Sequence, residues 1–494
     1  MLALENFAEW IFLQHADISE QSAIVDDDTV LTYGQLKHHT IQFAGYLRSL
    51  GFVPQQRIII SMDDCASWPV VFLGCLYAGL NPVMVSNIML PNDIEKIIKL
   101  SDAVAIVSDH VQDWSIPCID KKIILTCSSV PLKDFYRFHP DEPCFWLLSS
   151  GSTGEPKCIV NRHANLYHLL ELFSTEFKAD ASTKILSTAK MSWTYGLNVS
   201  ITFALGMGLT AYVIQGIPAP SKIANYISTH NVTHLFTVPG ILLSMLKHKT
   251  VLANPTLRVY SAGESLPATI TEQFFETYGM KVCNMFGLGE TTQVCIMQTD
   301  ANWQVGSIGQ PLSGVSYELR DDQGHLVEPG QIGELFVRSP CQASLYWKDL
   351  EKTQQVFQGP WVQTGDKCKC NSQGNLEYLG RCDDLVKIKG QTVVPVEVET
   401  VFSNFPGVED CTVVHCNNDS GLAELYAFVQ CGDLVDLELL QQHLKKYLAE
   451  YKIPKHIKFV NSLPKTLTNK KIRLASAQHK SGTTNSLTFS KEYI

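Results

Sequence analysis

The chain has 494 residues, 45% of them hydrophobic and 18% charged, which is typical of a globular protein with at least two domains. Its formal net charge of −10, with no basic stripe to offset it, argues against nucleic acid as a partner. The first residues lack the basic region of a secretion signal, and no apolar run reaches membrane-spanning length. We therefore expect a cytoplasmic protein without a membrane span.

The elements before residue 130 predict an α/β sheet with helices on both faces. Residues 1–60 predict a helix, a short hairpin and a second helix that Thr32 caps and that ends at Ser49. The apolar residues 68–85 are cut by Gly79, so they predict a buried helix and strand rather than a membrane anchor. The other elements predicted here are strands over 57–62, 103–109 and 121–127 and a helix over 93–102.

Residues 144–161, CFWLLSSGSTGEPKCIVN, form a glycine- and hydroxyl-rich loop between two apolar runs. Glycines let the backbone approach a phosphate, hydroxyls donate hydrogen bonds, and Lys157 adds a positive charge. The loop differs from the G-x-x-x-x-G-K-[ST] motif because Pro156 precedes the lysine and Cys158 follows it. The β-branched residues that follow predict a strand, so no helix dipole is available; a Ser/Gly linker is the alternative. The candidate phosphate-binding residues are Ser149, Ser150, Gly151, Ser152, Thr153, Gly154 and Lys157.

The helix and strand alternation continues beyond this loop. Helices are predicted over 163–177, 221–231 and 239–248, and strands over 184–190, 234–237, 257–261 and 280–286. Several strands end in glycine-rich loops, and ligands of open α/β sheets bind where such loops meet. The last part of the chain predicts a small α+β domain. Its elements are strands over 376–380, 385–394 and 408–416 and helices over 395–405 and 436–452.

Fifteen cysteines show no pairing framework. The nearest approach to a metal pattern is Cys368-x-Cys370 with Cys382 further on, whose spacing is not that of a zinc ribbon. We interpret these residues as free thiols of a reducing compartment.

Six motifs in order resemble those of the adenylate-forming superfamily of acyl-CoA synthetases, adenylation domains and luciferases. They are SSGSTGEPK, SAGE, FGLGET, QTGD, GRCDDLVKIKG and PKTLTNKK. The resemblance spans nearly the whole chain, from TYGQL at 32–36 to Lys470. The stretches CFWLLSSGSTGEPK, HANLYHLLELF and AKMSWTYGLN are most similar to the benzoate-CoA ligase branch.

The resemblance implies a large α/β domain over 1–382 and a small mobile α+β lid domain over 383–494, hinged at Asp383. It implies an acid-thiol ligase that needs ATP and Mg²⁺ and makes an acyl-adenylate. The acyl group then passes to a thiol, most simply that of CoA. Because the carboxylate approaches an anionic phosphate, cations are needed where charge develops. An aryl or short acyl acid is the expected substrate, since residues 191–196, MSWTYG, lack the aspartate that pairs with an amino acid's amine.

The same resemblance assigns site residues. Lys470 would bridge the carboxylate and the α-phosphate, Glu290 would hold Mg²⁺, and Thr153 would contact the outer phosphates with Ser152 and Lys157. Asp366 and Arg381 would bind the ribose, and Lys387 to Gly390 would line the thiol path. The positions beside adenine are Ala262, Gly263, Glu264, Asn284, Met285, Phe286 and Gly287. The positions lining the acyl pocket are Thr194, Tyr195, Val238, Gln293 and Val294.

Two alternatives stay open. A stand-alone adenylation enzyme would load the phosphopantetheine of an acyl-carrier protein instead of CoA. A degenerate member would bind nucleotide or acyl ligand without turnover, which three departures from the family pattern suggest. Gly289 replaces a phosphate-binding threonine, for which Thr291 is a candidate substitute, and Cys158 and Asn469 replace glycines.

Overall fold

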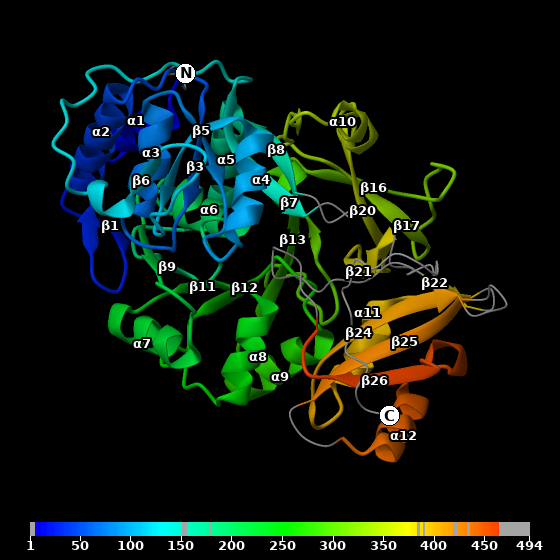
Figure 1. Cartoon of the computed structure of the whole chain (residues 1–494). Helices are drawn as coiled ribbons and strands as arrows, with labels where there is room; N and C mark the ends of the chain where they lie inside the picture. Colours follow the sequence, from blue (N-terminus) through cyan, green and yellow to red (C-terminus); the bar gives the residue numbers. More distant parts are fainter. Residues whose placement is uncertain are drawn as a thin grey trace. The chain divides into compact units, whose positions relative to one another are not determined.

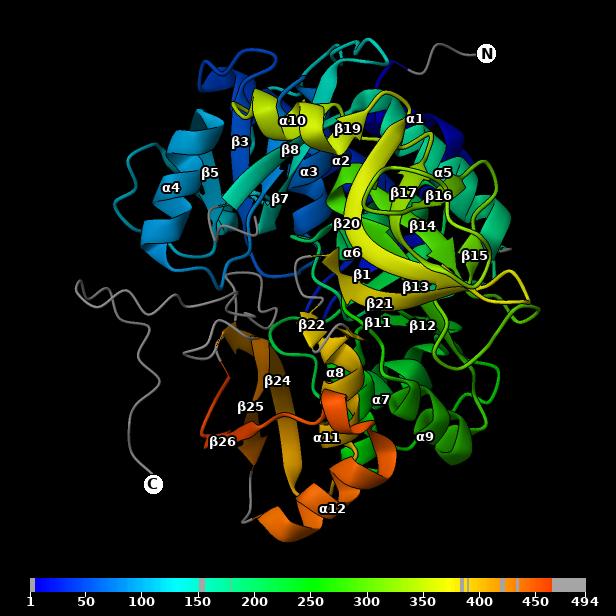
Figure 2. The same cartoon turned by 90° about the vertical axis from the view of Figure 1, so that its right-hand side faces the viewer.

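The structure, a computed structural model, describes residues 5–150, 156–177, 179–382, 386–388, 391–417, 423–431 and 435–463. The described chain forms two compact units, the first ending at Leu379 and the second beginning at Gly380 (Figures 1 and 2). The predicted hinge residue, Asp383, lies outside the described residues. The predicted fold class, a large α/β part followed by a small α+β part, is confirmed.

The first part of the larger unit alternates helices and strands as predicted. Its elements are α1 (Phe7–Gln14), β1 (Ser22–Val25), β2 (Val30–Thr32), α2 (Tyr33–Ser49), β3 (Arg57–Ser61), α3 (Trp68–Tyr77), β4 (Asn81–Met84), α4 (Pro91–Ser101), β5 (Ala103–Ser108) and β6 (Cys118–Asp120). Thr32 caps α2 by accepting from the Gln35 N–H at 3.2 Å, while the Gln35 side chain accepts from the Thr32 N–H at 2.9 Å. Every residue of α3 is buried, which explains its uniformly apolar sequence.

The strand predicted over 121–127 is wrong. Residues Lys121–Ile123 form a 3₁₀ turn because the Asp120 side chain accepts from the Lys122 N–H at 2.9 Å. The strand that pairs with β5 is the preceding segment, Cys118–Asp120. Local capping therefore ends the strand where the apolar pattern alone extends it.

The rest of the larger unit carries the candidate site. Its elements are β7 (Pro143–Ser150), β8 (Pro156–Arg162), α5 (His163–Phe177), β9 (Lys184–Ser187), α6 (Thr194–Leu197), the π-helix η3 (Asn198–Phe203), β10 (Thr210–Val213), α7 (Pro220–His230), β11 (His234–Thr237), α8 (Pro239–Lys247), β12 (Arg258–Ser261), α9 (Ala268–Tyr278), β13 (Val282–Leu288), η4 (Gly289–Thr291), β14 (Gln293–Met297), β15 (Gln310–Pro311), β16 (Ser316–Arg320), β17 (Ile332–Arg338), β18 (Leu345–Tyr346), α10 (Leu350–Val356), β19 (Phe357–Gln358), β20 (Trp361–Cys370) and β21 (Leu376–Arg381), whose last two residues belong to the second unit. As predicted, the loop after β7 joins strand to strand, and β7 and β8 are antiparallel.

Three sheets build this unit. One has the order β15-β14-β13-β12-β11-β9-β10-β1-β2, and its pairs from β1 to β13 are parallel. The second has the order β18-β8-β7-β4-β3-β5-β6, and the third the order β16-β17-β20-β19 with β21 on β20. The parallel strands β10 and β11 are buried at every position, as expected for strands covered on both faces. Figure 2 shows the long strand β20 beside β17 and β21.

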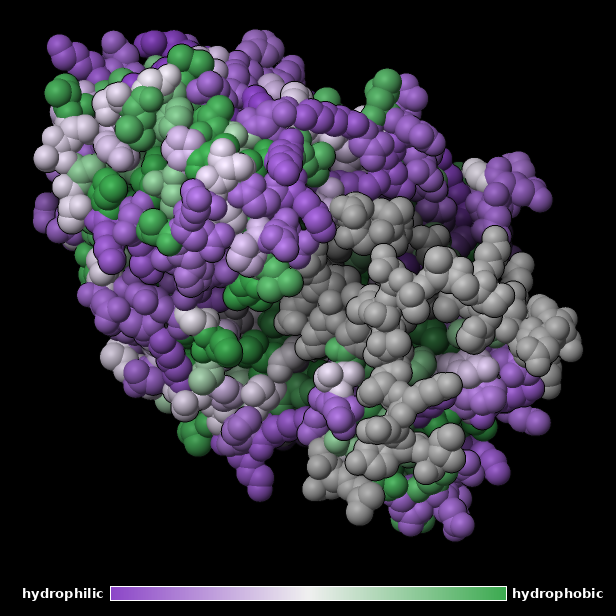
Figure 3. Space-filling model, in the orientation of Figure 1, coloured by the Kyte–Doolittle hydropathy of each residue, from purple (hydrophilic) through white to green (hydrophobic). Residues whose placement is uncertain are grey.

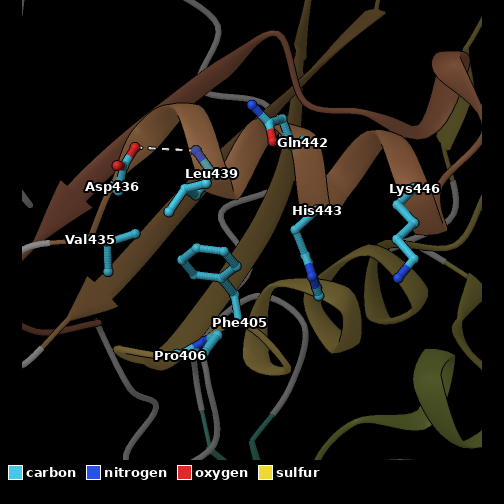
Figure 4. A pocket seen from close by; sticks show the side chains of 8 residues that line it. All are labelled: Phe405, Pro406, Val435, Asp436, Leu439, Gln442, His443 and Lys446. Carbon is cyan, nitrogen blue, oxygen red and sulfur yellow. Dashed lines mark hydrogen bonds between the residues drawn. The ribbon is translucent and has the colours of Figure 1, made fainter.

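The smaller unit holds β22 (Val386–Ile388), β23 (Gln391–Val393), α11 (Pro395–Ser403), β24 (Val408–Asn417), β25 (Ala423–Cys431), α12 (Leu437–Tyr447), η6 (Glu450–Lys452) and β26 (His456–Val460). The single strand predicted over 385–394 is wrong, since β22 and β23 pair as an antiparallel hairpin. The helix predicted over 436–452 ends early because Leu448 is extended. A shallow hollow of about 510 Å³ lies between α12 and the turn that follows α11, where Asp436 caps α12 (Figure 4).

The surface shows no single apolar band on the face drawn in Figure 3, where hydrophobic and hydrophilic described residues intermingle. Exposed large side chains such as Ile88, Val111 and Leu326 lie far apart in the sequence. None of the helices in the described ranges combines the length and apolar composition needed to cross a bilayer.

Burial of His163 makes the larger unit sensitive to acid. Its Nε2 accepts from the Phe7 N–H at 3.0 Å, its ring stacks on Phe138, and desolvation lowers its pKa from 6.5 to about 3. Between pH 6.5 and about pH 3, His163 binds a proton in the unfolded chain but stays neutral in the folded chain. The free energy of unfolding therefore falls as the pH drops from 6.5 towards 3, by about 1.4 kcal/mol per pH unit.

We predict that His163→Gln removes part of this acid sensitivity. Between pH 7.5 and pH 5, the variant should lose about 2 kcal/mol less unfolding free energy than the wild type. Urea unfolding followed by tryptophan fluorescence measures the difference. The exposed His248 provides the control, since His248→Gln should behave as the wild type. Equal acid sensitivity of wild type and His163→Gln would contradict the prediction.

Candidate functional site

The loops after β12 and β13 lie at the same edge of the large sheet, because these neighbouring strands are parallel. Gly263 turns the first loop with a φ of +90°, a conformation that favours glycine. Asn284 is buried, and its side-chain amide donates to the Ser307 carbonyl at 3.0 Å. Asn284 therefore fixes the loop that contains Ser307 against this edge of the sheet. Met285 is buried beside it, whereas Gly263, Glu264 and Gly287 are exposed.

Asp366 reaches the same edge from β20. Its carboxylate is buried and accepts a hydrogen bond from the Tyr378 hydroxyl at 3.3 Å. The Tyr378 ring lies 6.0 Å from the Phe286 ring of β13. The structure thus links Asp366 to the end of strand β13, whose residues 284–287 were predicted to flank adenine. Arg381 is exposed and belongs to the second unit, so no geometry between it and Asp366 is defined.

Glu290 lies in the short turn η4 and is clamped from β18. The Tyr346 hydroxyl donates to Glu290 Oε1 at 2.6 Å, and the Glu290 carbonyl accepts from the Ala343 N–H at 2.9 Å. Lys157 of β8 pairs with Asp349 at 3.2 Å, and its Nζ lies 5.6 Å from the centre of the Tyr346 ring. The structure therefore brings Lys157 and Glu290 together around one tyrosine.

Sequence reasoning missed Tyr346 and Asp349. Neither lies in a recognisable motif, and both reach the site through the pairing of β18 with β8, some 190 residues earlier in the chain. The adjacent aromatic residues Tyr346 and Trp347 favour a strand and do not by themselves predict a site.

Thr292, directly after η4, has a left-handed backbone with a φ of +60°, which is rare for a β-branched residue. Its buried hydroxyl accepts from the Asn165 amide at 2.9 Å and donates to Asn161 Oδ1 at 2.5 Å. Its carbonyl accepts from the amide of Asn198, the first residue of the π-helix η3. Such backbone strain costs about 1–3 kcal/mol and persists only where the surroundings hold it. The three asparagines supply that hold.

Two departures from the family pattern have structural explanations. A Cβ atom at Gly289 would lie 2.6 Å from Ile159 Cδ1, so a threonine there would displace Ile159. Thr291, the candidate substitute for the missing hydroxyl, is fully buried, and its hydroxyl is bonded to the Leu288 backbone. Cys158 is a buried core residue packed near Trp146, and burial raises its pKa to about 12.

The predicted acyl-pocket residues lie on a floor of aromatic rings. The Tyr195 hydroxyl donates to the Tyr260 carbonyl at 3.3 Å, and burial raises the pKa of Tyr195 well above its usual value. The Tyr195 ring lies 6.3 Å from Phe236, which stacks on Tyr260 at 4.8 Å. Thr194 and Val238 begin or precede helices here, and Val294 is buried opposite Gly287.

Several predicted site residues lie outside the described residues. They are Gly151, Ser152, Thr153, Gly154, Gly390, Asn469 and Lys470. The side chains of Ser150, Gln293 and Lys387 are likewise not described. Ser149 lies opposite Lys157 in the β7–β8 pair, and Ala262 is buried at the end of β12. In the described ranges, no three His, Cys, Asp or Glu side chains gather as a metal site, and the fifteen cysteines form no disulfide with one another.

The chain belongs to a known enzyme family. The AMP-binding enzyme family matches residues 13–347, and the AMP-binding enzyme C-terminal domain matches residues 397–470. The first match covers more than half of the chain, so the protein is a member of the AMP-binding enzyme family. The predicted adenylate-forming superfamily and the predicted class, an acid-thiol ligase, are confirmed.

Individual relatives narrow the resemblance. The benzoate–CoA ligase of Thauera aromatica is 29% identical over 489 residues, which cover 92% of this chain and 93% of the relative. A crystal structure of a benzoate CoA ligase from Burkholderia xenovorans LB400 is 30% identical with a TM-score of 0.84, over 94% of this chain and 98% of that one. The anthranilate CoA ligase AuaEII, solved with anthranoyl-AMP, is 26% identical with a TM-score of 0.87, over 95% and 96%. The predicted resemblance to benzoate-CoA ligases is confirmed.

We predict that Thr292→Val destabilises the larger unit. The change keeps the shape of the side chain but removes the donor to the buried Asn161 Oδ1, at a cost of about 1–3 kcal/mol, while the Asn165 amide keeps its bonds to the Cys341 and Gln342 carbonyls. Urea unfolding measures the loss. Thr292→Ser should retain most of the stability, and Thr229→Val, at an exposed threonine of α7, should change it little. A Thr292→Val variant as stable as the wild type would show that the hydroxyl bonds do not hold the turn.

Proposed function

We propose that the protein activates a small aryl carboxylic acid with ATP and transfers the acyl group from the adenylate to CoA. The main support for this proposal is the cluster in which Tyr346 contacts both Glu290, through its hydroxyl, and Lys157, through its ring. Support for the substrate class comes from relatives whose names specify benzoate and anthranilate as acids and CoA as acceptor.

The charges of the cluster suit phosphate chemistry. Attack of a carboxylate on the α-phosphate brings two anions together, so positive charge is needed there and on the departing pyrophosphate. Lys157 would contact the outer phosphates with Ser152 and Thr153. Lys470, from the second matched domain, would bridge the carboxylate and the α-phosphate.

The donor set also fits Mg²⁺. Glu290 is partly exposed, and this ion usually takes one or two carboxylates together with substrate phosphates. Bound there, Mg²⁺ would neutralise phosphate charge. Glu290 would orient it, and the bond from Tyr346 would orient Glu290.

Asp366 would bind the nucleoside. A buried carboxylate can accept from both ribose hydroxyls, and Arg381 would donate to the same sugar. The loop at 262–264 and residues 284–287 of β13 would flank the adenine. The ring contact between Tyr378 and Phe286 supports this assignment, since it connects the Asp366 carboxylate to β13.

The aromatic floor favours an aryl acid. The Tyr195 hydroxyl donates to the Tyr260 carbonyl, so the substrate would contact the Tyr195 ring rather than its hydroxyl. Thr194, Val238, Gln293 and Val294 would complete the pocket.

We infer two domains, 1–382 and 383–494, that rotate about Asp383 between the half-reactions. One orientation would present Lys470, and the other would present Lys387 to Gly390 for thiol entry. Fifteen cysteines without a disulfide suit a reducing compartment, which supports a cytoplasmic location.

The test of the proposed function is AMP release with a panel of aryl and aliphatic acids, with CoA or a phosphopantetheinylated carrier protein as acceptor. We expect kcat/KM for the best aryl acid to exceed that of aliphatic acids by about tenfold or more, because a well-filled apolar pocket discriminates by a few kcal/mol. Release that needs the carrier would favour a carrier-loading enzyme. ATP binding without any pyrophosphate exchange would favour a degenerate member.

We also predict that Lys470→Ala separates the two half-reactions. Adenylate formation, measured by pyrophosphate exchange, should fall about 100-fold or more, since a charge at the reacting phosphate is lost. Transfer from preformed acyl-AMP to CoA should change less than about threefold, because by then that phosphate leaves with AMP. Lys471→Ala is the matched control and should resemble the wild type. Equal loss of both half-reactions in Lys470→Ala would refute the assigned role.

A further inference from the structure

Tyr346 contacts both charged groups that the proposed function assigns to the phosphates. Its hydroxyl donates to Glu290 Oε1 at 2.6 Å, and the Lys157 ammonium lies 5.6 Å from its ring centre. The side chain is buried. A single phenol therefore holds an anion at its hydroxyl and faces a cation with its ring.

Tyr346 is held in place by strand pairing with β8 and by a hydrogen bond from its own N–H to a threonine side chain. Tyr346 lies opposite Ile159 of β8, and the next residue, Trp347, donates its N–H to the Cys158 carbonyl at 2.9 Å. The Tyr346 N–H donates to Thr353 Oγ1 at 3.0 Å, and the ring packs 5.6 Å from that of Phe357. The ring therefore has a defined position without any ligand.

The two contacts differ in their electrostatics. A hydrogen bond from a phenol to a carboxylate is short and orients the acceptor. In the described chain, no hydrogen bond reaches Glu290 Oε2, so this oxygen is the one for a cation. Lys157 is balanced by Asp349, whose other oxygen caps α10 through the Lys352 N–H at 3.0 Å. Entering phosphates would compete with Asp349 for the lysine, while the ring continues to face it.

We propose that Tyr346 is a positioning residue. It would hold Glu290 and Lys157 at a fixed separation, so that Glu290 can bind the metal while Lys157 binds the outer phosphates. The inference rests on the proposed function and names the residue that organises that site. Tyr346 acts through Glu290 and Lys157.

Two substitutions separate the contacts. Tyr346→Phe removes the hydroxyl and keeps the ring, whereas Tyr346→Leu removes both. The measurement is Mn²⁺ binding by electron paramagnetic resonance in the presence of α,β-methylene-ATP, together with binding of the metal-free analogue by calorimetry. We expect Tyr346→Phe to weaken Mn²⁺ binding about tenfold and to change analogue binding less than about twofold. Tyr346→Leu should weaken analogue binding as well, by about threefold.

Tyr317→Phe is the matched control. Tyr317 on β16 donates its hydroxyl to Cys370 Sγ at 3.4 Å, and its change should leave both affinities as in the wild type. Unchanged or tighter Mn²⁺ binding by Tyr346→Phe would overturn the inference, and so would a drop in melting temperature with no change in either affinity. If Tyr346→Leu does not fold, Tyr346→Phe decides alone. Failure of the proposed function is recognised separately, because the wild type would then release no AMP with any acid.

Discussion

The hydrogen bonds of the Thr292 hydroxyl hold the turn on which the candidate site depends. A β-branched residue does not adopt a φ of +60° by its own preference, so its surroundings must hold it there. Asn161 and Asn165 hold it from β8 and α5, and Asn198 adds a bond from the π-helix. π-Helical turns often occur at functional sites, and this one presents Asn198 to the Thr292 carbonyl. Glu290 precedes this anchor by two residues, so its backbone has little freedom.

In the same region, the charges of Glu290 and Lys157 are each stabilised by a neighbouring side chain. Glu290 is bonded to Tyr346, and Lys157 is paired with Asp349, so each charge has a partner before any ligand binds. A partly buried charge without a partner is energetically unfavourable, so these pairs stabilise the region when no ligand is bound. In the proposed function, phosphate oxygens would take the place of the Asp349 carboxylate at Lys157. Both charges thus have a partner in the absence of a ligand.

The departures from the family pattern bear on whether the enzyme is degenerate. Gly289 has lost a hydroxyl, and Ile159 occupies the space where a threonine side chain would begin. Cys158 lies in the core, and so its thiol is a packing group rather than a lost phosphate contact. The third departure, Asn469, lies outside the described residues. Lys157, Glu290 and Asp366, which the family resemblance assigns to the site, are present in the chain, and the assay of pyrophosphate exchange distinguishes an active enzyme from a degenerate member.

Much of the fold followed from local signals. The helix over 163–177, the capped helix ending at Ser49 and the buried helix and strand within 68–85 all have the bounds that periodicity, caps and glycine stops predict. The errors are local as well. At 121–127 an aspartate cap outweighed the apolar run, and at 385–394 one predicted strand is a hairpin. Apolar runs signal burial, but they do not specify with which strand a segment pairs.

The sequence by itself determined the family and the kind of chemistry, because the motifs are short runs in which glycine, hydroxyl and charge are consecutive. Only the tertiary structure decided which side chains hold those motifs in place. Tyr346, Asp349 and the asparagines around Thr292 meet the site across gaps of up to 192 residues, through strand register and buried hydrogen bonds. Such contacts leave no period or spacing in the chain. Each is specified by the packing of whole sheets, which no single stretch of sequence encodes.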